Sequence, residues 1–144
     1  MAALTQGRNT PYRLPGHSAA PAAAGVTIHK GALVMRRADG HAVEGRAAAG
    51  LVGIGVAVAN TRNADGDGAV TVTYQAGTAR FEMATGADAI TIAQIGDLCW
   101  AIDDQTVAAT DGGGSRSPAG IVADVDDLGV WVRLDEALTK FAAA

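Results

Sequence analysis

The sequence of 144 residues is long enough for one domain with its own core. Its single cysteine, Cys99, excludes an internal disulfide framework and a zinc site made of several cysteines. The net charge is −4, but residues 1–25 hold two arginines and no acid, so the remainder is strongly acidic. An acidic body disfavours binding to nucleic acid, which depends on clustered Lys and Arg.

The first 25 residues contain prolines, glycines and an alanine-rich run, with no sustained hydrophobic period. This composition predicts an extended N-terminal arm that is ordered only when something holds it. The longest apolar run, residues 47–59, is well short of the roughly 20 residues that span a bilayer. The N-terminus also lacks the apolar core of a signal peptide. We therefore expect a soluble protein that is made in the cytoplasm and has no membrane partner.

Short segments of alternating hydrophobicity, separated by Gly, Asp and Asn, begin at Val26. They predict strands at residues 26–29, 32–36, 51–59, 69–74, 78–83, 90–92, 98–102, 121–125 and 129–134. No segment between them is long and periodic enough for a substantial helix. The expected fold is all-β: a compact antiparallel sandwich of the jelly-roll type, or a small barrel, over residues 26–134.

An internal echo divides this region into two half-repeats. The stretch "VTIHKGALVMRRADGHAV" resembles "ITIAQIGDLCWAIDDQTV", with one residue added before the glycine. "VGIGVAVAN" parallels "AGIVADVDD", and "AVTVTY" parallels "GVWVRL". We expect the two copies to face each other across one core.

Residues 135–144 predict a short C-terminal helix or tail. Asp135 can cap it, and Leu138 and Phe141 share one face. A helix this short is not stable alone, so it must dock on the body or on another chain.

Several motifs imitate functional sites. "GLVGIGVAVAN" lacks the third glycine of a dinucleotide-binding loop and alternates as a strand does. "NADGDGAV" resembles a calcium loop but has Tyr74 where the bidentate Glu belongs, so a hairpin turn explains it better. "DVDDLG" could bind a hard cation, but a solvated hairpin end is favoured. We expect no metal site.

No catalytic constellation emerges from the remaining candidates. His17, His29 and His41 lie in separate segments, and "GGGSRSPAG" is typical of a flexible loop rather than a nucleophile elbow. Cys99 is expected to be a small buried hydrophobe. We predict no catalytic residue, no cofactor and no enzyme activity. Two alternatives stay open: a carbohydrate-binding β module and, with less support, a small nucleotide hydrolase of the dUTPase type.

The ordered pattern "GLVGIGVAVAN … GAVTVTYQAGTARFEMATGADAITIAQIGDLCWAIDD … SPAGIVADVDDLGVWVRLD" resembles the capsid decoration, or cement, proteins of tailed bacteriophages. The likeness covers about residues 26–134. Its motifs are β signals whose order, rather than any single element, carries the resemblance. The segment "TPYRLPG" has no counterpart in the family pattern.

The resemblance implies a structural protein of the virion. It would bind the outer surface of the assembled icosahedral head and lock neighbouring major capsid protein subunits against internal DNA pressure, after synthesis in the host cytoplasm. Its partners would be the major capsid protein and itself, as a homo-dimer or homo-trimer. Candidate anchors lie in the arm and in the tail, namely Pro11, Tyr12, Arg13, Leu14, Leu138 and Phe141.

Overall fold

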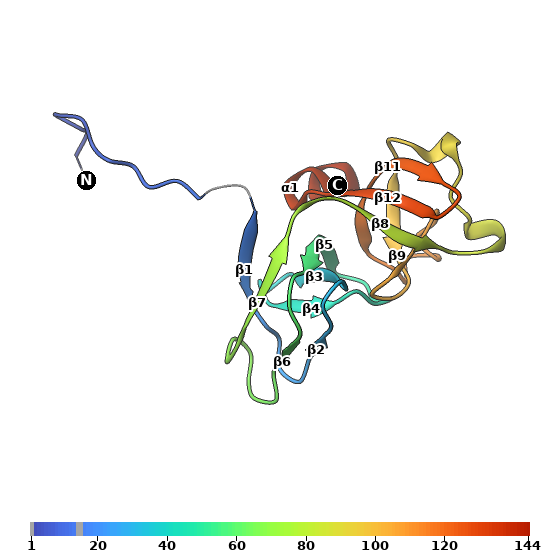
Figure 1. Ribbon diagram of the computed structural model, residues 1–144, viewed down its shortest axis with the longest axis horizontal. Coiled ribbons are helices and arrows are strands. Elements are labelled where there is room, and N and C mark those ends of the chain that lie inside the picture. Colours follow the sequence, from blue (N-terminus) through green and yellow to red (C-terminus); the bar gives the residue numbers. More distant parts are fainter. Residues whose placement is uncertain (1, 14–15) are drawn as a thin grey trace.

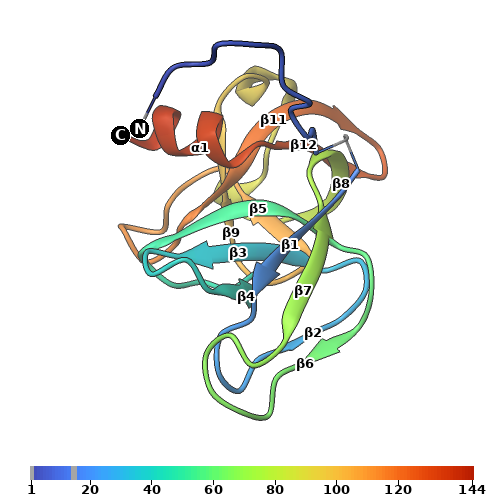
Figure 2. The same cartoon turned by 90° about the vertical axis from the view of Figure 1, so that its left-hand side faces the viewer.

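The computed structural model describes residues 2–13 and 16–144 and has the expected all-β fold with a short C-terminal helix. Five strands form the first sheet, in the order β1-β7-β5-β3-β4 (Figures 1 and 2). Their bounds are His17–Pro21 for β1, Thr71–Gln75 for β7, Leu51–Ala57 for β5, Leu33–Arg37 for β3 and Ala42–Glu44 for β4.

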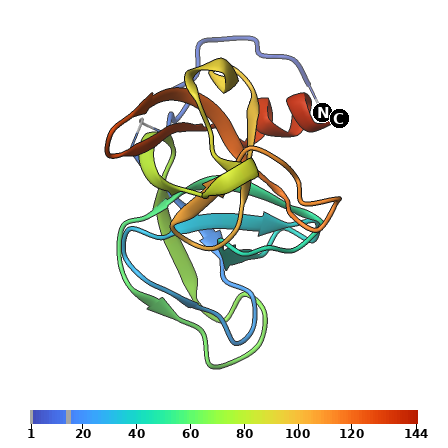
Figure 3. The same cartoon turned by 90° about the vertical axis from the view of Figure 1, so that its right-hand side faces the viewer.

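Five later strands form a closed barrel, in the order β10-β8-β12-β11-β9 (Figure 3). These are β8 (Gly77–Met83), β9 (Leu98–Ala101), β10 (Thr106–Ala108), β11 (Pro118–Asp126) and β12 (Gly129–Leu134). The smaller elements are the ribbon of β2 (Thr27–Ile28) and β6 (Thr61–Arg62), the 3-10 turns η1 (Gly86–Asp88) and η2 (Ile92–Gln94), and helix α1 (Glu136–Ala143). Of the two expected architectures, the barrel is therefore present in the second half.

The two halves share one strand order, because β1-β7-β5-β3-β4 corresponds to β8-β12-β11-β9-β10. The register agrees as well. Leu33 on β3 lies opposite Val56 on β5, and the corresponding Leu98 on β9 lies opposite Ile121 on β11. In both halves the pairing then skips one residue, on β5 in the first half and on β11 in the second, which is the signature of a β-bulge. We call residues 17–75 the first module and residues 77–134 the second module.

The modules differ in how completely they close. In the second module, Met83 on β8 pairs in parallel with Val107 on β10, and Ala84 N donates to Val107 O at 2.9 Å. The first module repeats this contact in reduced form: Ala22 forms a single parallel bridge to Ala42, whose carbonyl accepts from Ala23 N at 2.9 Å. The first module thus remains a five-stranded sheet, with one isolated bridge where the second module closes its barrel. These parallel contacts are the exception to the expected antiparallel pairing.

The sequence echo is real, but its expected alignment was wrong in the last two strands. In the structure, Val56 of the first module is equivalent to Ile121 of the second, and Gln75 is equivalent to Arg133, because the members of each pair have the same strand partners in their own modules. Both matches are displaced by two residues from the alignment read from the sequence. A strand repeats its inward and outward sides every two residues, so a two-residue slip leaves the hydrophobic pattern unchanged.

The modules pack through equivalent strands, β5 against β11, as the subunits of a two-fold dimer do. Gly53 makes this possible, because a Cβ at that position would overlap the carbonyl oxygen of Ala119 on β11. The buried apolar side chains of both modules form one continuous cluster. Two copies therefore face each other across one core, although each builds its own sheet.

The segment expected to be an arm is shorter than residues 1–25. Strand β1 lies inside that range and pairs along its length with β7, and Ala20, Ala22 and Ala23 are buried. The detached part is residues 2–13, all exposed, which project from the body in Figure 1. The strand expected at residues 90–92 is absent and η2 begins there instead, because Thr91 and Gln94 form a capping box.

Candidate functional site

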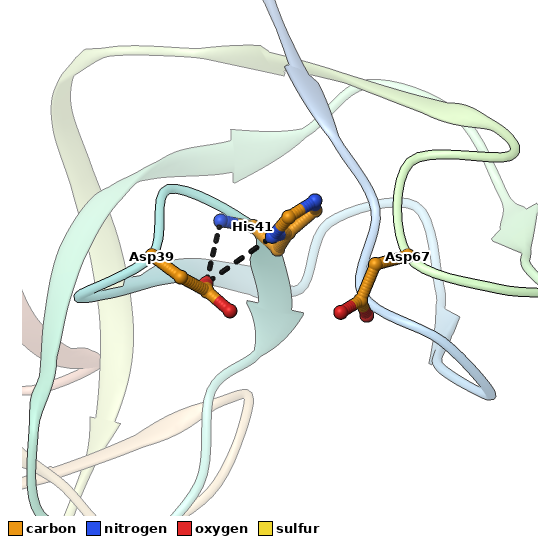
Figure 4. A group of neighbouring side chains, drawn as sticks. All are labelled: Asp39, His41 and Asp67. Atoms are coloured by element: carbon orange, nitrogen blue, oxygen red, sulfur yellow. Dashed lines mark hydrogen bonds and ion pairs between the residues drawn. The ribbon is translucent and has the colours of Figure 1, made fainter.

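A compact group of charged side chains joins two loops of the first module. Asp39 and His41 lie in the turn between β3 and β4, and Asp67 lies in the loop that leads to β7 (Figure 4). One ligand atom from each lies within 4.8 Å of the others. We call this group, together with Arg37, the Arg37 cluster.

Arg37 holds the Arg37 cluster together. Its guanidinium forms an ion pair with Asp39 and a second one with Asp67 Oδ2 at 3.1 Å. Asp39 Oδ1 also accepts from His41 N at 3.1 Å and lies 3.2 Å from His41 Nδ1. The other oxygen of Asp67, Oδ1, accepts from Ala24 N at 2.7 Å. The cluster therefore ties the β3–β4 turn to the segment that follows β1.

Both carboxyl groups are held in the ionised form. Hydrogen bonds from Arg37 and from the His41 backbone lower the pKa of Asp39 well below its usual range. The Ala24 backbone N–H, followed by Arg37, lowers the pKa of Asp67. Two carboxylates and an imidazole are common metal ligands, but here a guanidinium already supplies the positive charge between them. The arrangement is best suited to a structural ionic clamp.

The sequence imitating a calcium loop is part of this clamp. Asn63 is fully buried, and its Nδ2 donates to the carbonyl oxygens of Ala22, Ala23 and Gly66 at 2.9–3.2 Å. Its Oδ1, the atom that would bind a cation, instead accepts from Asp65 N at 3.1 Å. Turn chemistry was the right prediction, but the hairpin was not: the loop joins β6 and β7, which do not pair with each other.

The second module has a counterpart clamp at another place. Asp88 accepts from the Thr110 hydroxyl at 2.6 Å and from Arg116 at 3.1 Å, and these bonds lower its pKa. Arg116 also donates to Thr110 O at 3.0 Å. Residues 112–120 were expected to form a flexible loop, but residues 118–120 belong to β11 and the preceding part is fastened at Arg116.

The "DVDDLG" segment forms the expected hairpin end between β11 and β12. Asp126 Oδ1 accepts from the backbone N–H groups of Leu128 and Gly129, and its Oδ2 accepts from Trp131 Nε1 at 2.7 Å. Arg80 lies over the Trp131 ring, 5.7 Å from its centroid. This carboxylate organises the turn and holds the indole against the barrel.

The predicted anchors fall in two separate places. Pro11, Tyr12 and Arg13 are exposed on the arm, and Leu14 lies outside the described residues. On α1, Leu138 is half-buried but Phe141 is 82% exposed. The side that faces the body instead carries Thr139, which is fully buried.

A hollow of about 440 Å³ lies between α1 and the ends of β3, β5 and β11. Its apolar lining includes Leu51, Val52 and Pro118. Arg36 lines it too, but its guanidinium is engaged by Glu136 at 2.7 Å, Gly40 O at 3.1 Å and the Tyr74 hydroxyl at 3.2 Å. The hollow is therefore a packing gap beside α1, and the Arg36 guanidinium is not free to bind a ligand in it.

His17 and His29 are exposed, as expected for surface residues, but His41 is half-buried in the Arg37 cluster. Sequence reasoning missed this cluster, because its members come from segments separated by about thirty residues. The Arg-x-Asp-x-His spacing of the turn was visible, but nothing in the sequence linked it to Asp67.

No family model, curated protein or solved structure matches this chain. Among the described residues, no helix has the length and apolar character needed to cross a membrane. The functional argument therefore depends on the residues of the chain itself.

Proposed function

We propose that this chain is a structural virion protein that binds the outside of an assembled bacteriophage head and cements neighbouring capsid subunits. Its partners are the major capsid protein and further copies of itself. The ordered β motifs that resemble decoration proteins motivate the proposal. The fold agrees with the all-β architecture that the resemblance implies.

The observation that carries the proposal is the placement of the exposed large apolar side chains. Leu4 and Tyr12 stand on the arm at 69% and 87% exposure, and Phe141 stands on α1. Side chains of this kind on projecting segments favour contact with a protein surface over binding of a small molecule in a cavity. An arm that becomes ordered only on binding reaches a neighbouring subunit at low cost, and many copies multiply weak contacts.

Co-sedimentation tests the proposal directly. Purified protein is mixed with expanded heads that lack it and with unexpanded proheads. Saturable binding to expanded heads, at a fixed copy number per capsid protein, is the expected result. Absence of binding to both shells would refute the cement role.

The structure sharpens the test of the anchors. A deletion of residues 1–25 removes β1 and would disrupt the first module, so the informative deletion is residues 2–13. Tyr12→Ala with Arg13→Ala probes the arm, and Phe141→Ala probes α1. All three side chains are exposed, so these variants should fold normally and bind heads more weakly. The same samples on a glycan array test the carbohydrate-binding alternative.

A further inference from the structure

The two modules differ in net charge although they share a strand order. Residues 17–75 contain five basic and four acidic residues, whereas residues 77–134 contain three basic and nine acidic residues. The arm adds Arg8 and Arg13 and no acid. The molecule is therefore positive at its N-terminal end and strongly negative in the second module.

The exposed apolar side chains follow the same division. The first module has none of the large exposed ones, whereas the second has three: Ile92 at 72%, Ile95 at 45% and Leu128 at 71% exposure. Ile92 and Ile95 belong to the η2 segment. Leu128 lies in the β11–β12 turn.

Backbone hydrogen bonds place the η2 segment beside β11. Gly96 N donates to Val122 O at 2.8 Å, and Val122 N donates to Asp97 O at 2.9 Å. From Val122, β11 continues toward its turn with β12. Three exposed carboxylates border this surface, which we call the acidic end, and it consists of Ile92, Ile95, Asp97, Asp124, Asp127 and Leu128.

Neither the acidic end nor the arm has its charges neutralised within the described part of the chain. Asp97, Asp124 and Asp127 form no ion pair there, and neither do Arg8 and Arg13. In Figure 1 the arm leaves one end of the long axis, and the β11–β12 turn lies at the opposite end. The arm extends away from the acidic end of its own chain, which favours a contact between two molecules.

We propose that the arm of one copy docks on the acidic end of a second copy, in a head-to-tail contact. Leu4 and Tyr12 would cover Ile92, Ile95 and Leu128, while Arg8 and Arg13 would face the carboxylates. Twelve extended residues span about 40 Å, so the arm can cross the barrel surface of a neighbour. Because the two surfaces differ, the contact is heterologous and builds rings or chains rather than two-fold dimers. It does not depend on a capsid, and its failure would leave the proposed binding to the capsid intact.

Sedimentation velocity of the full chain over a concentration series tests the contact. The expected result is self-association at low salt that weakens at high salt, since the charges are exposed and screened. Arg8→Glu with Arg13→Glu should weaken association at least tenfold. Asp124→Lys with Asp127→Lys should weaken it similarly, and mixing the two reversed variants should restore it.

The matched control is Asp65→Lys with Asp103→Lys, an equal change of charge at exposed positions; Asp103 follows β9 at the end of β11 opposite to its turn with β12. This variant should associate like the wild type. Ile92→Ser with Leu128→Ser tests the apolar part without disturbing the core. Hydrogen exchange on associated samples should show new protection in residues 2–13, 92–97 and 124–128.

Two outcomes would overturn the proposal. One is a full chain that stays monomeric at the highest soluble concentration in low salt, in which case the arm has another partner, such as the capsid. The other is association that persists after both charge reversals or after deletion of residues 2–13.

Discussion

The two modules share a strand order and the same β-bulge, yet they differ in closure, in charge and in the placement of their ionic clamps. The shared features all concern the backbone: which strands pair, where one residue is skipped and where two backbones meet. The features that differ are carried by side chains on loops and surfaces. In this duplicated fold, the backbone plan is maintained while each copy's surface is adapted separately.

The difference in closure explains where the first module needs extra support. Its sheet has only a single bridge, at Ala22, in the place where β8 and β10 of the second module pair over two positions and close the barrel. Asn63 and the Arg37 cluster both bind the backbone around residues 22–24, next to that bridge. In the first module, side-chain hydrogen bonds thus stabilise the contact that the second module makes by pairing two strands.

The largest expected effect comes from separating the modules. Gly53→Val places a side chain against the Ala119 carbonyl, so β5 and β11 must move apart, and we expect a loss of about 3 kcal/mol or more. Gly66→Ala is the control, because a Cβ there meets nothing within 4 Å. Chemical denaturation measures both variants. A Gly53→Val protein with the stability of the wild type would show that the modules do not depend on this close approach.

A smaller loss is expected at the edge of the first module. Asn63→Ala removes the side-chain donor to the Ala23 carbonyl oxygen and one of the two donors to that of Ala22, which keeps Gly68 N, at a cost of about 2 kcal/mol. Hydrogen exchange should rise around residues 22–24 and 42 while the second module stays protected. Equal loss of protection in both modules would mean that they unfold only as one unit.

The fold class was predictable because strands with alternating patterns, such as β5 and β12, carry their own signal. The tail helix was predictable for a similar reason: Asp135 caps α1 and accepts from Leu138 N, as its position indicated. The "DVDDLG" turn also formed as expected. These are local features, determined by residues that lie close together in the sequence.

Two of the features that the sequence did not predict depend on distant segments of the chain. Strand β1 contains alanines and a proline, which have low strand propensity, and it forms because β7 pairs with it from about fifty residues away. The short β4 and β10 were missed for another reason: they pair locally, with β3 and β9, but three residues carry too little alternation to indicate a strand. The Arg37 cluster likewise requires two loops to meet, and no pattern in either loop indicates the other.

The two ionic clamps predict an acid dependence of stability. The pKa values of Asp67 and Asp88 are lowered in the folded protein, so each contributes stability above the ordinary value of 3.8 and loses it as the pH falls further. Asp67→Asn and Asp88→Asn should each melt at a lower temperature than the wild type at neutral pH. The differences should shrink in acid, and a constant difference would assign the effect to lost hydrogen bonds alone.

The smallest effect is expected at Cys99, because the first module has a valine at the equivalent position. Cys99 on β9 lies opposite Gly120, and its counterpart Val34 on β3 lies opposite Gly55. Both side chains are fully buried, and burial raises the pKa of Cys99 to about 12. Cys99→Val should therefore change stability by less than about 1.5 kcal/mol, because the fold accepts valine at the equivalent place.

Thiol labelling supplies the second readout for this position. The wild-type thiol should resist a thiol reagent in the native state and react in denaturant, since the thiolate is the reactive form. Fast native-state labelling would mean that the barrel opens at β9. A large loss of stability in Cys99→Val would mean that the 3.6 Å contact from Sγ to Gly120 O matters more than the shape shared by the two modules.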